Sequence, residues 1–193
     1  MFLSIVALLQ IVVSCCNCNS LNWSCTTHFG DASYSSRKKA ARNELIDASD
    51  ERFTARDKSV LRQLGITHIV NAASGKYRIN TGPEFYRDLN IDYFGVEADD
   101  DPHFDLSVFF FPAAQFIRAG LQSPNGKVLV HCAMGISRAA SIVLAFLMIS
   151  EGLSLIDAIR TVSEHRDICP NPGFLEQLRQ LDIKLEAKRR SLT

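Results

Sequence analysis

The chain has no excess charge of either sign. Over 193 residues, Lys and Arg together number 21, and so do Asp and Glu. A protein that attracts nucleic acid or an acidic membrane through its overall field needs a basic excess. We therefore expect no nucleic-acid partner, and we interpret the local basic stretches at 37–42 and 186–190 as solvated flanks.

Cysteine is scarce through most of the chain. Four of the six cysteines fall between residues 15 and 25, and after them only Cys132 and Cys169 remain. A domain built on disulfides would distribute its cysteines throughout its length. The sequence thus predicts a domain with reduced thiols and a cytoplasmic location, and 193 residues suffice for one domain with a sizeable core.

Positive charge is missing from the N-terminus, where no Lys or Arg precedes Arg37. The apolar run over residues 1–13 suits a signal-peptide core and is short for a membrane span. Three interpretations stay open: a secretory signal, a segment palmitoylated on the cysteines that follow, or residues from a variant or mispredicted exon. We expect residues 1–42 to be non-globular apart from this run, and 43–190 to form the domain. A membrane is expected as a partner only if this segment is used.

Hydrophobic patterning predicts strands that alternate with helices. Buried β-branched runs predict strands over 66–73, 91–98 and 127–131. Amphipathic or fully apolar stretches predict helices over 57–65, 106–121, 137–152, 154–166 and 172–188. This alternation predicts an α/β fold with a central, mostly parallel, twisted sheet that is covered by helices on both faces.

Local signals predict the ends of two helices. Asp105 is placed to cap the helix over 106–121, and Pro112 within that helix predicts a kink. Asn171 followed by Pro172 is typical of a helix start.

The stretch "KVLVHCAMGISRAAS" (127–141) joins an apolar strand to an apolar helix through a loop with one glycine and no proline. In open α/β sheets, ligands bind where strands end and helices begin. Backbone amides in such a loop can converge on one anion, helped by the positive end of the helix. Cys132, at the base of that nest, should therefore be a thiolate.

The residues around Cys132 extend this interpretation. Arg138 offers a planar fork for two phosphate oxygens, which lysine lacks. Gly135 lets the backbone approach the anion, and His131 is placed to bond the loop backbone and help hold the thiolate. A lone buried cysteine is usually inert, but this combination at a strand–helix junction favours chemistry. Nucleophile, guanidinium and amide cradle together predict cleavage of phosphate monoesters.

The stretch "HCAMGISR" matches H-C-x5-R, the signature of the protein tyrosine phosphatase superfamily. With "GVEADDDPHFDLS" and "CPNPGFLEQL", the chain resembles an atypical dual-specificity phosphatase, most similar to the small muscle- and testis-type members, over about residues 49–188. The resemblance implies the tyrosine phosphatase fold, a phosphocysteine intermediate, and no metal or cofactor. It implies that Cys132, Arg138 and an aspartate are catalytic. The implied substrate-binding residues are His131, Ala133, Met134, Gly135, Ile136, Ser137 and Arg166, the last as a contact to a second phosphate in some relatives.

Expulsion of a tyrosine oxygen requires a proton, so a carboxylic acid must face the nest. The candidates are Asp99, Asp100 and Asp101, and the resemblance places Asp100 at the family's acid position. It also implies that Asn171 supports the loop from the last helix, a role compatible with capping that helix.

The resemblance implies phosphoproteins as substrates and signalling kinases among the candidate partners. The stretch after the first buried strand, "NAASGKYRIN", is short, and this favours a shallow cleft that admits phosphotyrosine, phosphoserine and phosphothreonine. The loop interior "AMGIS" contains no Lys or Arg, which disfavours phosphoinositide headgroups.

The chain departs from the family in two places. Ala139 stands where relatives carry Ser or Thr, whose hydroxyl steadies the cysteine sulfur when phosphocysteine is hydrolysed. We therefore expect slowed turnover, and a phosphoprotein-binding scaffold is the alternative hypothesis. The second departure is the family's first strand, "W-P-x-L-x-[IL]-[GS]-D", which the residues at 41–48 do not match. Its loss would expose an edge of the sheet.

Overall fold

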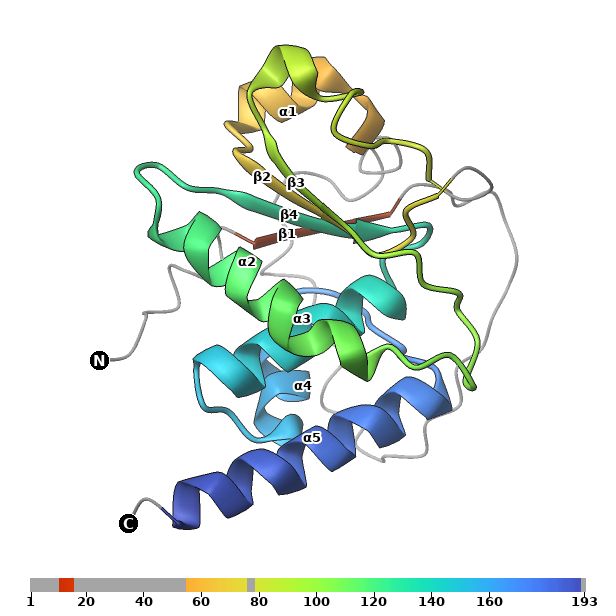
Figure 1. The fold of residues 1–193 in the computed structure, drawn as a ribbon, viewed down its shortest axis with the longest axis vertical. Coiled ribbons are helices and arrows are strands. Elements are labelled where there is room, and N and C mark those ends of the chain that lie inside the picture. Colours follow the sequence, from red (N-terminus) through yellow and green to blue (C-terminus); the bar gives the residue numbers. More distant parts are fainter. Residues whose placement is uncertain (1–10, 16–54, 76–78, 192–193) are drawn as a thin grey trace, which may run out of the picture.

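The structure, a computed structural model, describes residues 11–15, 55–75 and 79–191. Its sheet has the strand order β1-β4-β2-β3, and every strand pair within the described residues is parallel. The strands are β1 (Ile11–Cys15), β2 (His68–Asn71), β3 (Asp92–Gly95) and β4 (Val128–Cys132). Because all of them run the same way, their carboxyl ends meet at one edge of the sheet (Figure 1).

Helices lie on both sides of this sheet. The helices are α1 (Lys58–Leu64), α2 (Phe110–Gln122), α3 (Arg138–Ser150), α4 (Leu155–Ser163) and α5 (Pro172–Arg190), with short 3-10 helices η4 (Arg87–Leu89) and η5 (Ser107–Phe109). Figure 1 shows α1 on one side of the sheet and the other four α-helices on the opposite side. The predicted α/β class, with a parallel sheet flanked by helices, is confirmed.

The strand β4 and the helix α3 lie in the core. All five residues of β4 are buried, and so is every residue of α3 from Arg138 to Met148. Helix α3 packs against α2, α4, α5 and β4 at once, which is why its sequence is apolar on nearly every face. The loop between β4 and α3 is therefore held at both ends by buried elements.

Pro112 lies within a helix, as predicted, but it stands in the first turn, where no kink is required. The stretch 106–121 divides into η5 and α2, and Pro112 is the third residue of α2. There it replaces an N–H that has no partner within the helix, so it is compatible with a regular helix. Asp105 does not cap α2, whose N-cap is Phe109. Its Oδ1 accepts instead from the Ser107 N–H at 3.1 Å and from the Ser107 hydroxyl at 2.6 Å, at the start of η5.

The start of α5 agrees with the sequence. Asn171 is its N-cap, with Oδ1 accepting from the Phe174 N–H at 2.9 Å, and Pro172 is its first residue. None of the helices in the described ranges combines the length and the apolar character needed to cross a membrane.

Part of the apolar N-terminal run forms the edge strand β1. It pairs with β4 from Ile11 opposite Val128 to Cys15 opposite Cys132. Most of the segment 1–42, which was expected to be non-globular, lies outside the described residues, as does the expected boundary at 43. The described piece fills the position beside β4 at the edge of the sheet.

The pairing of β1 with β4 predicts an alternating response to proline. In a parallel pair, the N–H groups of successive residues point to opposite sides of the strand, so only one of Val12 and Val13 donates to β4. Of Val12→Pro and Val13→Pro, one should lower the free energy of unfolding by about 1–3 kcal/mol and the other by clearly less. Urea unfolding of the full chain, followed by circular dichroism, measures both. Two variants as stable as the unmodified chain would show that β1 does not pair in solution.

Candidate active site

The loop after β4 folds back over the sulfur of Cys132. Cys132 is the last residue of β4 and only 1% exposed. Gly135 has a φ of 69°, a left-handed conformation that favours glycine, and its N–H donates to Cys132 Sγ at 3.1 Å. An N–H aimed at the sulfur stabilises the thiolate, the form that acts as a nucleophile.

Arg138 is the last residue of the loop over 132–138, which we call the catalytic loop, and its side chain contacts the segment that follows β3. It is the first residue of α3 and 9% exposed. Its Nη1 donates to the carbonyl oxygen of Ala98 at 3.1 Å, and its Nε lies 3.5 Å from Asp100 Oδ2. These contacts fix the plane of the guanidinium. The sequence gives no signal for the Ala98 contact, because any residue supplies a carbonyl oxygen.

Asp100 is in direct contact with the catalytic loop. Its Oδ1 accepts from the Ser137 hydroxyl at 2.6 Å and from Asn171 Nδ2 at 3.0 Å, while its Oδ2 faces Arg138. By contrast, Asp101 accepts from the N–H of His103 at 2.7 Å within its own turn. Among the adjacent aspartates, the geometry therefore favours Asp100 as the acid. We call residues 97–106 the acidic loop.

The segment that leads into α5 supports the catalytic loop from the other side. The Asn171 N–H donates to the Ser137 hydroxyl oxygen at 3.1 Å. The Cys169 N–H donates to the Ile136 carbonyl at 2.9 Å. The contact at Cys169 was not expected from the sequence, since it involves only the backbone.

The other predicted site residues differ in exposure. His131 is fully buried, while Met134 is 48% exposed. Ala133 and Ile136 are half-buried within the catalytic loop. Arg166 is half-buried beyond the end of α4, and its contact with a second phosphate stays a prediction.

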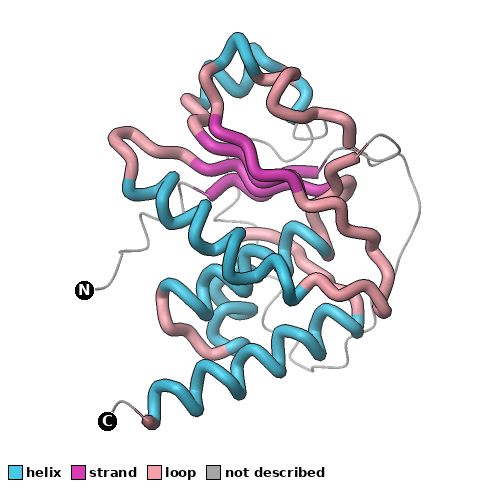
Figure 2. The backbone as a smooth tube through the Cα atoms, viewed as in Figure 1, coloured by secondary structure: helices cyan, strands magenta, loops and turns pink. Residues whose placement is uncertain are grey.

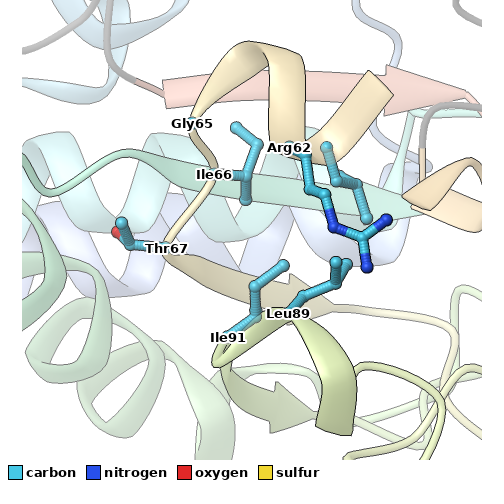
Figure 3. A pocket seen from close by; sticks show the side chains of 7 residues that line it. Arg62, Gly65, Ile66, Thr67, Leu89 and Ile91 are labelled. Carbon is cyan, nitrogen blue, oxygen red and sulfur yellow. The ribbon is translucent and has the colours of Figure 1, made fainter. Parts of the chain in front are cut away.

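A pocket of about 250 Å³ lies at the opposite edge of the sheet, where β2 and β3 begin (Figure 3). It is lined by Leu61, Arg62, Gly65, Ile66, Thr67, Leu89 and Ile91. The guanidinium of Arg62 already pairs with Asp88 at 2.8 Å. In the part of the chain that is described, His, Cys, Asp and Glu form no group of three that could hold a metal ion.

Comparison with known proteins identifies the family. The sequence model for "Dual specificity phosphatase, catalytic domain" matches residues 51–184. The chain belongs to this family. It is 62% identical over 133 residues to "Dual specificity protein phosphatase 13B" of Homo sapiens, covering 69% of this chain and 67% of that protein. The protein of the same name from Mus musculus is 61% identical over 133 residues, with the same coverage.

The fold agrees with solved structures of the same class. Human DUSP28 superposes with a TM-score of 0.61 at 31% identity, covering 70% of this chain and 90% of that chain. The resemblance to atypical dual-specificity phosphatases is thereby confirmed. The chain is an enzyme of the dual-specificity protein phosphatase class.

His131 predicts a pH dependence of stability. Burial lowers the pKa of His131 from 6.5 to about 4. Between these values the unfolded chain binds a proton that the native chain does not, so stability should fall as the pH falls from 6.5 through 4. Below both pKa values, the free energy of unfolding should be lower by about 3 kcal/mol than at neutral pH because of His131.

The free energy of unfolding of the chain and of His131→Asn, measured in steps from pH 7 to 4, tests this effect. The variant should show a shallower slope in this range, whatever its absolute stability. Equal slopes would mean that His131 titrates alike in the native and unfolded states.

Proposed function

We propose that the chain hydrolyses phosphotyrosine, phosphoserine and phosphothreonine in proteins through a phosphocysteine intermediate. One observation carries the proposal: the Cys132 sulfur, the Arg138 guanidinium and the Asp100 carboxylate converge on one loop whose Gly135 amide points at the sulfur. A nucleophile, a fork for phosphate oxygens and a proton donor are the groups that the reaction requires.

In the first step, the Cys132 thiolate attacks phosphorus and the bond to the substrate oxygen breaks. Loop amides and Arg138 hold the other phosphate oxygens, because charge-assisted bonds to a planar guanidinium are strong and directional. Asp100 gives its proton to the leaving oxygen. Its Oδ1 accepts two hydrogen bonds, from Ser137 and Asn171, so the proton is carried on Oδ2 once the substrate phosphate takes over the Arg138 guanidinium, whose Nε lies 3.5 Å from that oxygen.

In the second step, water attacks the phosphocysteine and the sulfur leaves as a thiolate. Asp100, now ionised, takes a proton from that water, which restores the starting state. The reaction is balanced by water alone, and we propose that it proceeds without a metal or cofactor.

Ala139 bears on the second step. It is fully buried and follows Arg138 in the first turn of α3. Ser141 is the nearby hydroxyl in the helix, but it donates to the Ser137 carbonyl at 2.8 Å. Alanine at position 139 has no hydroxyl for the leaving sulfur, and the Ser141 hydroxyl is already bonded. We propose that breakdown of phosphocysteine therefore limits turnover.

We propose phosphoproteins as substrates, signalling kinases among them, and the cytoplasm as the compartment. The absence of Lys and Arg from the loop interior 133–137 supports a protein over a phosphoinositide substrate. A membrane would be a partner only through residues 1–20.

Slow breakdown of the phosphocysteine would also suit a second candidate function, that of a phosphoprotein-binding scaffold. The fold is shared with the human "tyrosine phosphatase-like serine/threonine/tyrosine-interacting protein", at 33% identity and a TM-score of 0.54, covering 68% of this chain and 87% of that chain. Turnover above that of a Cys132→Ser blank separates the enzyme from the scaffold.

Ala139→Ser should raise kcat. A hydrogen bond to a charged group corresponds to about 1.5–3 kcal/mol, or roughly 10- to 150-fold in the limiting step. Rapid-quench kinetics with an aryl phosphate should show a burst in the original chain and a smaller burst in the variant. Ala140→Ser, which adds the same atom to the next buried position, is the control. A linear time course in the original chain contradicts slow phosphocysteine breakdown.

Asp100→Asn should lower kcat/KM for phenyl phosphate by about 10²- to 10⁴-fold, because phenolate is expelled without a proton. It should also flatten the limb of the pH–rate profile on which activity falls as the acid loses its proton. Asp101→Asn should keep both the rate and the profile. The reverse result, a flat profile for Asp101→Asn alone, would assign the acid to Asp101.

A further inference from the structure

The acidic loop lies against the first turn of α5 at a distance that only glycine permits. A Cβ added to Gly173 would lie 1.9 Å from the carbonyl oxygen of Pro102 and 2.5 Å from its carbonyl carbon. Both distances are far below van der Waals contact, and the atoms they meet are backbone. Glycine is a poor helix former, so its presence in this turn is explained by the close approach. Figure 2 shows the loop beside the start of the long C-terminal helix.

One turn further along α5, Gln177 bonds the end of the same loop. Its Oε1 accepts from the N–H groups of Leu106 at 2.8 Å and Ser107 at 2.9 Å. Its Nε2 donates to the carbonyl oxygen of Phe104 at 2.8 Å. The amide thus adds three bonds to a turn that is also closed by its own backbone, where the Leu106 N–H donates to the Phe104 carbonyl at 3.1 Å.

Helix α5 therefore contacts the acidic loop at three successive points. Asn171 bonds the Asp100 carboxylate, Gly173 packs on Pro102, and Gln177 bonds the backbone from Phe104 onward. These contacts hold the loop along its length, and all of them come from α5 or its N-cap.

We propose that Gly173 and Gln177 are positioning residues that hold the acidic loop, and with it Asp100, in the position from which Asp100 gives its proton to the leaving oxygen. The proposal rests on Asp100 being the general acid, as proposed above. Neither residue touches the reacting atoms. Their effect reaches the reaction only through the placement of the Asp100 proton.

The test compares two substrates that differ in their need for a proton. Phenyl phosphate releases a poor leaving group and needs the acid, whereas 2,4-dinitrophenyl phosphate releases a stable phenolate. The measured quantity is kcat/KM, which covers the steps through departure of the phenol and is independent of later phosphocysteine breakdown. In Gly173→Ala and in Gln177→Met, kcat/KM should fall about tenfold or more for phenyl phosphate and by less than about threefold for the activated ester.

Two matched controls accompany these variants. Gly82→Ala adds a methyl group where no atom lies within 4 Å, and Gln180→Met makes the same exchange on the solvent-exposed part of α5. Both should keep the original ratio between the two substrates. In an Asp100→Asn background, Gly173→Ala should add no further dependence on the leaving group, because residue 100 then has no proton to donate.

The outcomes separate the two proposals. If Asp100→Asn shows no preference for the activated ester, the acid assignment fails and this proposal fails with it. If Asp100→Asn shows the preference but the folded α5 variants keep the original ratio, only the positioning proposal is overturned. An equal loss on both substrates also overturns it, because that result indicates general damage to the fold. Either α5 variant alone decides the question if the other does not fold.

Discussion

The carboxylate of Asp100 joins three segments that are far apart in the sequence. It accepts from Ser137 in the catalytic loop and from Asn171 at the start of α5, while it belongs to the loop after β3. These contacts form because β3 and β4 run parallel and release their following loops at the same edge of the sheet. The buried strand β4 and helix α3 then fix the catalytic loop as a rigid partner for the carboxylate.

Much of this site could be predicted from the sequence, because its central part is local. Cys132, Gly135 and Arg138 lie within seven residues between a buried strand and a buried helix, so spacing alone places them together. The cap at Asn171 was equally visible. Contacts made by backbone atoms were not, since Ala98 and Cys169 use groups that every residue has. The helix expected to start at 106 starts at Phe110, because a 3-10 turn precedes α2, and Pro112 therefore falls in the first turn.

The edge of the sheet shows a different limit of sequence analysis. A short apolar run has the same composition as a leader peptide or a buried strand, and periodicity cannot separate them. Strand β1 depends on a partner, β4, that lies more than a hundred residues away, and no local signal specifies that pairing. The sequence did indicate that the sheet would have an exposed edge, since the residues at 41–48 do not match the family's first strand. In the structure, β1 covers the edge of β4.

In the proposed mechanism, the contacts around Cys132 serve the two chemical steps unequally. The Gly135 amide stabilises the thiolate both before attack and when sulfur departs, so it assists both steps. The bonds to Asp100 place the proton that the first step consumes, and they involve Ser137 and Asn171 rather than the residue after Arg138. A methyl group at Ala139 leaves all of these contacts intact. In the proposed mechanism Asp100 and the Gly135 amide act in both steps, whereas a hydroxyl at position 139 would act only in the second. A chain with Ala139 and a complete acidic loop would then perform the first step efficiently while the second stays slow.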